Sequence, residues 1–156
     1  MATLIVPRPD ADPFPTLGKQ VCDFLSERAV FGPGDLRGQP ATLDAEKRGA
    51  IYRAYEVFPQ GHSRAGRRRF QRVGLSWPKG SAKTEFMAWL AFAELHPESP
   101  VRCDGFDASG NPVGRPVTDP YIPLVAYTAE QTEELAFGAL YVVCSEGPDA
   151  DLFDIG

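Results

Sequence analysis

The stretch GLSWPKGSAKTEFMAWLAFAEL, residues 74–95, decides the fold that the sequence predicts. Its second half, from Lys83 to Leu95, predicts a helix that is apolar on most sides and therefore buried on most sides. Its first half is typical of a phosphate-binding loop. Such a loop needs backbone N–H groups that converge on phosphate, a lysine that reaches the β and γ oxygens, and a following hydroxyl that ligates Mg²⁺.

The loop matches the GxxxxGK[ST] spacing only in part. Lys83 and Thr84 supply the lysine and the hydroxyl, but Trp77 and Ala82 stand at the first and sixth positions, where glycine is usual. Alanine keeps the loop slim but disfavours positive φ, so we expect an adjusted or strained backbone there. The alternative is a plain strand-turn-helix, although a lysine near a helix N-terminus is unfavourable without an anion.

The residues around this stretch predict alternating strands and helices. The segment 69–77 mixes apolar and polar residues and predicts a strand, residues 101–120 predict an irregular hairpin, and residues 121–128 predict a buried strand. Thr128 and Gln131 have the spacing of a capping box and predict a further helix. This order predicts a parallel or mixed sheet with crossover helices.

The N-terminal part predicts helices without strands. Residues 1–15 contain four prolines and are expected to form a flexible leader. The apolar spacing predicts one helix over residues 16–31 and a second from about residue 44 to residue 57. Together they predict a small α-helical segment at residues 16–61.

The charge of the chain is unevenly distributed. The net charge is −5, yet five of the sixteen basic residues lie in RAGRRRFQR, residues 64–72. These arginines either contact phosphates of DNA or of an ATP bound to a neighbouring subunit, or they form a solvated loop before an edge strand. The candidates for phosphate contact are Arg64, Arg67, Arg68 and Arg69.

Other functional classes find little support in the sequence. The three cysteines form no CxxC pair, which indicates reduced thiols and argues against a zinc site. His62 and His96 have no neighbouring ligand pattern. No apolar run approaches the roughly 18 residues that a membrane helix needs.

Three segments in order resemble the large subunit of tailed-phage terminases, the motors that package DNA, and most of all the group found in phages of actinobacteria. They are LSWPKGSAKTEFMAWLAFAEL, PVRCDGFDASGNPVGRP and PLVAYTAEQTEE…ALY, and the resemblance covers roughly residues 17–156. It implies a P-loop NTPase-type α/β fold, a three-layer sheet with crossover helices, incomplete here and preceded by the α-helical segment. Residues 62–156 would be the N-terminal part of the ATPase domain, without the nuclease domain.

The resemblance also implies roles for individual residues. Lys83 matches the phosphate lysine and Thr84 the Mg²⁺ ligand, while Lys79 stands where the family often carries a basic residue that assists γ-phosphate chemistry. Gln60 and Gln71 are both candidates for the adenine contact. The predicted site for the ATP phosphates consists of Pro78, Lys79, Gly80, Ser81, Ala82, Lys83 and Thr84.

The function that the resemblance implies is the ATP-binding portion of a viral DNA-packaging motor. Its cofactors would be ATP and Mg²⁺. Its partners would be double-stranded phage DNA, the small terminase subunit, the portal and further copies in a ring, in the host cytoplasm. No Walker B acid pair is recognisable, because the run ending in Glu146 continues a predicted helix, so the catalytic acids are expected beyond Gly156 and turnover by this chain is expected to be negligible. The alternatives are a non-catalytic module that binds other packaging components and an unrelated, truncated P-loop protein.

Overall fold

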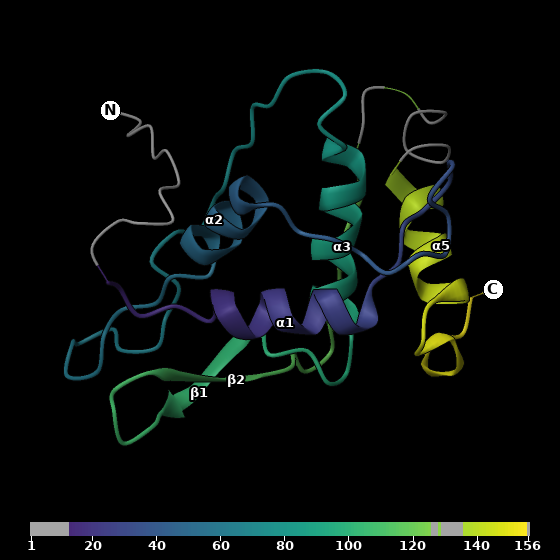
Figure 1. The fold of residues 1–156 in the computed structure, drawn as a ribbon. Helices are drawn as coiled ribbons and strands as arrows, with labels where there is room; N and C mark the ends of the chain where they lie inside the picture. The colour runs from purple at the N-terminus through teal and green to yellow at the C-terminus, as the bar shows by residue number, and fades with distance from the viewer. Residues whose placement is uncertain (1–12, 126–127, 129–135, 156) are drawn as a thin grey trace.

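The computed structural model describes residues 13–125, 128 and 136–155, and their fold is shown in Figure 1. The predicted mixture of helices and strands is confirmed. In chain order the elements are α1 (Gly18–Arg28), α2 (Ala45–Ala54), α3 (Lys83–Leu95), β1 (Arg102–Phe106), β2 (Pro112–Arg115), α5 (Gly138–Glu146) and the short 3₁₀ helix η2 (Ala150–Leu152).

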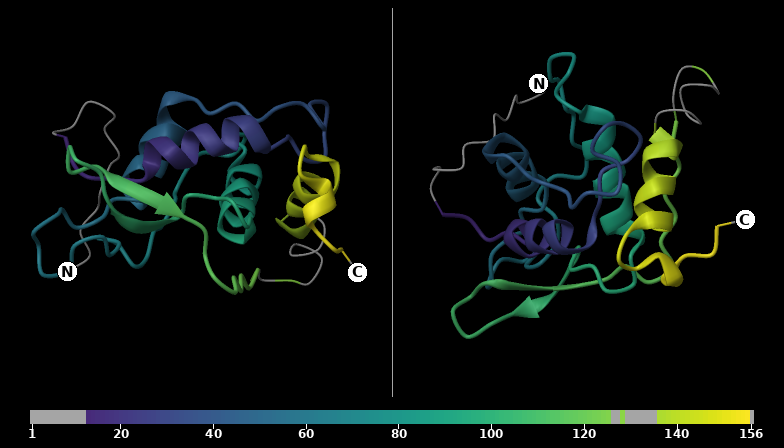
Figure 2. Two further views of the ribbon diagram at one scale, coloured as in Figure 1. Left: turned by 90° about the horizontal axis from the view of Figure 1, so that it is seen from below. Right: turned by 45° about the vertical axis from the view of Figure 1, so that its right-hand side comes forward.

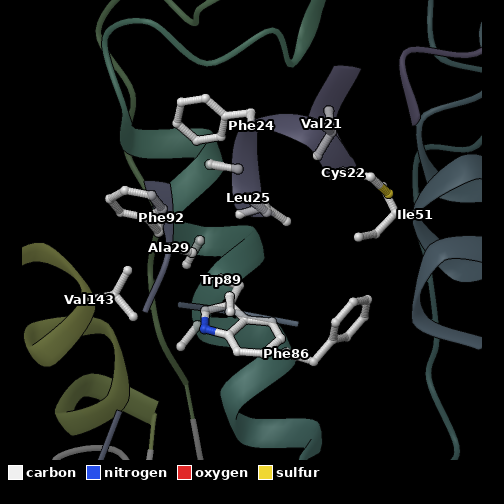
Figure 3. Packing of buried hydrophobic residues seen from close by; sticks show 14 of the residues in the cluster. Val21, Cys22, Phe24, Leu25, Ala29, Ile51, Phe86, Trp89, Phe92 and Val143 are labelled. Carbon is white, nitrogen blue, oxygen red and sulfur yellow. The ribbon is translucent and has the colours of Figure 1, made fainter. Parts of the chain in front are cut away.

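Helix α3 is the centre of the fold and has the predicted bounds. α5 packs along one side of it and α1 crosses it near its C-terminal half (Figures 1 and 2). The aromatic side chains of Phe86, Trp89 and Phe92 are each only 1% exposed, and they meet residues of α1 and α5 in a single core (Figure 3). Met87 is the exception to the predicted burial on most sides, since it is 51% exposed.

Helices α1 and α2 lie close together because Gly18 has no side chain. A Cβ added at Gly18 would lie 2.4 Å from the Cα of Tyr52, so only glycine allows this approach. Asp44 caps α2 by accepting a hydrogen bond from the backbone N–H of Lys47 at 2.8 Å. Both helices are shorter than predicted at each end.

The predicted hairpin is confirmed as an antiparallel pair in which Arg102 faces Arg115 across the strands. Its turn is held by Asp107, whose carboxylate accepts the backbone N–H groups of Ser109 and Asn111, each at 2.9 Å. The side chain of Gln20 on α1 joins the hairpin to the helices through two hydrogen bonds of 2.9 Å to its backbone.

Two predicted strands are wrong. Residues 69–77 form no strand, and Val73 within them is 55% exposed. Residues 121–125 are also irregular, with Tyr121 88% and Val125 90% exposed, rather than a buried strand. The physical reason is that neither segment lies beside a partner strand among the described residues, so no ladder of hydrogen bonds holds it in an extended conformation. The described sheet is therefore two-stranded and antiparallel, and no parallel strands with crossover helices occur among residues 13–125, 128 and 136–155.

The structure describes only the later part of the helix that the capping box predicts. Gln131 lies outside the described residues, whereas α5 carries the expected buried residues Ala139, Leu140 and Val143. The run that ends in Glu146 is helical. None of the described helices has the length and apolar composition that a membrane span requires.

The chain after α5 folds back onto α3 through a buried histidine. His96 at the end of α3 accepts the backbone N–H of Glu98 at Nδ1 (3.0 Å), so Nε2 carries the proton and donates it to Asp149 at 3.0 Å. Arg28 also donates to Asp149, at 2.7 Å. The structure therefore gives His96 a structural role that joins the ends of α1, α3 and α5.

Candidate functional site

The loop that precedes α3 has an unusual backbone. Ala82 has φ 53° and ψ 41°, in the left-handed region, and Gly80 has φ 91°. A left-handed conformation costs a residue with a Cβ roughly 1–2 kcal/mol. The strain expected where alanine replaces the usual glycine is therefore present. Such outliers persist where the surroundings or a function maintain them.

Successive residues of this loop alternate in the sign of φ. Ser81, with negative φ, lies between Gly80 and Ala82, and alternating φ signs of this kind bring successive N–H groups into a concave, anion-binding arrangement. Helix α3 begins directly afterwards, at Lys83, and no side chain caps it. Its first-turn N–H groups therefore have no intrahelical acceptor, and they add the positive end of the helix dipole.

The side chain of Lys83 folds back over the loop. Its Nζ donates to the carbonyl of Trp77 at 2.8 Å, and no carboxylate of the described residues lies within 4.0 Å of it. Ser81 stabilises the turn of the loop, since both its hydroxyl and its N–H donate to the carbonyl of Pro78. An ammonium group has three donors, so two remain available to an anion.

Trp77 anchors the N-terminal side of the loop. Its ring centroid lies 5.0 Å from that of Phe86 on α3. The Nζ of Lys47, a residue of α2, lies 5.7 Å from the centroid of the Trp77 ring. A glycine could make neither contact. The large residue at the first motif position therefore attaches the loop to two helices, in the absence of a strand before it.

Glu85 lies in the first turn of α3 and joins it to the loop after α1. Its carboxylate accepts the backbone N–H of Gly32. Burial raises the pKa of Glu85, and the hydrogen bond from Gly32 opposes that rise. A carboxylate in this position is favoured by the helix dipole, so Glu85 stabilises the start of the helix.

Lys79 and Thr84 are both exposed at the loop. The hydroxyl of Thr84 has no hydrogen-bond partner among the described residues, so it is available as a ligand. Mg²⁺ keeps several waters and takes one or two protein oxygens together with phosphate oxygens, and a single free hydroxyl beside a phosphate site fits that donor set. Within the part of the chain that the structure describes, no three His, Cys, Asp or Glu side chains gather as a metal site.

The four candidate arginines have different surroundings. Arg64 lies over the ring of Phe58 at 5.0 Å, and Arg69 pairs with Glu56 at 3.6 Å. Arg67 and Arg68 instead line a hollow against the hairpin. The four arginines thus divide into two pairs, and their contact with phosphates of DNA or ATP stays a prediction.

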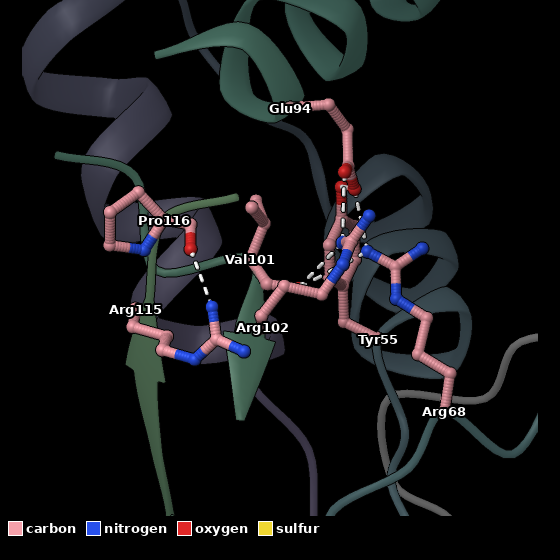
Figure 4. Close-up of polar contacts among 7 residues, drawn as sticks. All are labelled: Tyr55, Arg68, Glu94, Val101, Arg102, Arg115 and Pro116. Carbon is pink, nitrogen blue, oxygen red and sulfur yellow. Dashed lines mark hydrogen bonds and ion pairs between the residues drawn. The ribbon is translucent and has the colours of Figure 1, made fainter. Parts of the chain in front are cut away.

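The hollow brings together arginines that lie far apart in the sequence. It has a volume of about 580 Å³, and Arg102 and Arg115 of the hairpin line it beside Arg67 and Arg68. Figure 4 shows Arg68 and Arg102 directed at the same carboxylate, Glu94, at 2.6 and 2.9 Å. The predicted hairpin could have suggested this grouping, because it places Arg102 and Arg115 opposite each other.

Neither candidate for the adenine contact lies at the loop. Gln60 lies against Gly110 in the hairpin turn, and Gln71 lines the hollow. Glu94, which pairs with two arginines of the hollow, is eleven residues after Lys83 on α3. At 1.5 Å per residue, the helix therefore separates the hollow from the loop by about 16 Å. Comparisons of the chain with protein-family models, with curated proteins and with solved structures found no match.

Proposed function

We propose that the loop from Trp77 to Thr84 binds the phosphates of ATP, and that the chain is the ATP-binding portion of a DNA-packaging motor of the terminase large-subunit type. The observation that carries the proposal is the left-handed Ala82 followed directly by an uncapped helix and by Lys83, whose ammonium spans the loop. A strained backbone and an uncapped helix start are both costly, and a bound anion would offset both costs.

The residues of the loop would share the work of binding. The N–H groups of Gly80 and of residues 82–84 would donate to phosphate oxygens, and Lys83 would exchange the carbonyl of Trp77 for a phosphate oxygen. Thr84 would hold Mg²⁺, which neutralises phosphate charge when bound. Lys79 is exposed in the loop, and it would approach the γ-phosphate as a point charge rather than as the planar fork of an arginine.

The finer parts of the proposal rest on the resemblance of the three ordered sequence segments. These parts are the three-layer P-loop fold, the packaging of double-stranded phage DNA, and the association with the small subunit, the portal and further copies. We propose binding of ATP without turnover for this chain, because its sequence has no recognisable Walker B acid pair to position water at the γ-phosphate.

Equilibrium dialysis with labelled ATP and Mg²⁺ tests the proposal. Lys83→Ala should weaken binding at least about tenfold, since hydrogen bonds to charged groups contribute roughly 1.5–3 kcal/mol. Lys19→Ala is the matched control, because it removes an exposed lysine of α1 that pairs with Asp23. Arg72→Gln is a second control, because Arg72 is exposed and lies outside both the loop and the hollow. Equal affinity of the wild-type protein and Lys83→Ala would refute the proposal.

A second candidate function is a module that binds other packaging components without catalysis. The observation in its favour is the exposure of Tyr121 and Val125, at 88% and 90%, in a stretch without regular structure. Pull-down with purified small subunit or portal in the absence of ATP tests it. The double variant Tyr121→Ser with Val125→Ser should lose the partner, and retention of the partner by that variant would count against it.

A further inference from the structure

We propose that the arginine hollow is a second binding site, separate from the loop, for a small phosphate monoester that carries a flat ring, such as a nucleoside monophosphate. The hollow is defined by Arg67 and Arg68, by Arg102 and Arg115 of the hairpin, and by the apolar side chains between them.

The hollow carries an excess of positive charge. Its four arginines are met by two carboxylates, because Glu94 pairs with both Arg68 and Arg102, and Asp104 lies 3.7 Å from Arg115. Four positive charges against two negative charges leave +2. Arg67 has no carboxylate within 4.0 Å among the described residues. A phosphate monoester, with a charge between about −1.5 and −2 at neutral pH, matches this excess better than a carboxylate does.

One feature of the hairpin favours an anion in the hollow. Arg102 and Arg115 face each other directly across the strands, and like charges in that position destabilise a strand pair. A phosphate in the hollow would reduce this repulsion, because arginine forms paired hydrogen bonds to phosphate.

The size and the apolar lining of the hollow favour a ligand that carries a flat ring over inorganic phosphate. The volume of about 580 Å³ lies within the about 300–1,000 Å³ of small-molecule sites. Phe70 and Phe106 line the hollow together with Val57, and aromatic faces of this kind stack on flat rings. A double helix is too wide to enter such a hollow, so a small ligand fits it better than DNA does.

The reactivity of the Cys103 thiol can be used to measure whether a ligand occupies the hollow. It lines the hollow and is partly exposed, whereas Cys22 and Cys144 are buried. Burial raises the pKa of Cys22 and of Cys144 to about 11, so these two thiols are mostly protonated and react slowly near pH 8. The rate of alkylation of the native protein by iodoacetamide, followed by mass spectrometry of the peptide with Cys103, therefore reports on the hollow.

The experiment measures that rate with AMP, with inorganic phosphate, with adenosine and with a single-stranded oligonucleotide. We expect AMP to slow the alkylation of Cys103 in a saturable way, and phosphate or adenosine alone to need much higher concentrations. Arg67→Gln should raise the AMP concentration for half-protection about tenfold or more. Arg72→Gln, an exposed arginine of the same segment outside the hollow, should leave it unchanged.

The outcomes separate this site from the loop. Lys83→Ala should keep the protection by AMP, and loss of that protection would place the ligand at the loop and overturn the proposal. Equal protection of the wild-type protein and Arg67→Gln, or the absence of any protection, would also overturn it. Protection by the oligonucleotide and not by AMP would reject a small ligand in favour of a nucleic acid strand.

Discussion

At the scale of single residues, Ala82 and Lys83 determine the conformation of the loop before α3. Ala82 has a conformation that glycine adopts freely, and Lys83 reaches back to the carbonyl at the start of the loop. The sequence motif alone predicted a strained or adjusted backbone at Ala82, since the need for positive φ at that position follows from local geometry. It did not predict the anchoring of Trp77 against α2 and α3, which depends on contacts between distant segments.

Replacement of Ala82 by glycine should stabilise the protein. Glycine loses the strain of the left-handed conformation, while its freer unfolded state offsets part of the gain. We expect the free energy of unfolding to rise by about 0.5–1 kcal/mol in urea denaturation. Ala88→Gly, within the buried part of α3, is the control and should lower it by about 1 kcal/mol or more. A lower stability of Ala82→Gly would show that the positive φ is not the native conformation.

At the scale of elements, helices were predictable and strands were less so. The bounds of α3 follow from a local apolar pattern between a loop and a proline, so they could be read from the sequence. A strand needs a partner, and the pattern of residues 69–77 contains no information about which segment pairs with it. The hairpin was predictable because its two strands are neighbours and its turn residues are characteristic.

The packing of α1 on α2 depends on Gly18. Alanine is normally the better helix residue, by up to about 1 kcal/mol. Its Cβ would nevertheless lie 2.4 Å from the Cα of Tyr52, so we expect Gly18→Ala to lower the free energy of unfolding by about 2 kcal/mol or more. Lys19→Ala, at the next and exposed position, should change it by less than about 0.5 kcal/mol. If Gly18→Ala were as stable as the wild type, the two helices would not pack as described.

At the scale of the whole molecule, α3 separates two places that gather positive groups. The loop from Trp77 to Thr84 leads into its N-terminal end, and the lining of the arginine hollow includes Val101 and Arg102, which follow its C-terminal end. The loop could be predicted because its residues are consecutive. The hollow could not, because its arginines come from segments more than thirty residues apart that only the tertiary fold brings together.

The carboxylate of Asp149 holds the ends of three helices together and makes stability depend on pH. Burial acts to raise the pKa of Asp149, but hydrogen bonds from Arg28 and His96 lower it further, and the result is a pKa below the ordinary value. A lowered pKa stabilises the folded protein above the unfolded pKa of about 4, and that contribution is lost as the pH falls through the folded pKa.

Asp149→Asn should therefore be less stable than the wild-type protein by about 1–3 kcal/mol at pH 7. The difference should shrink when the pH falls below about 4, because the wild-type carboxyl group then becomes neutral as well. Urea denaturation of both proteins between pH 3 and pH 7 measures it. Asp151→Asn, an exposed neighbour in η2, is the matched control. A difference that is the same at every pH would contradict a role for the charge of Asp149.

The proposed binding of nucleotide phosphates at the start of α3 is tested most directly by ¹H–¹⁵N NMR of the wild-type protein during addition of ATP with Mg²⁺. We predict saturable shifts of the backbone amides of Gly80 and of residues 82–84, because their N–H groups would donate to phosphate oxygens, and we predict that Lys83→Ala abolishes these shifts. Amides of Gly80 and of residues 82–84 that stay in place at saturating ATP, while the protein remains folded, would contradict phosphate binding by this loop.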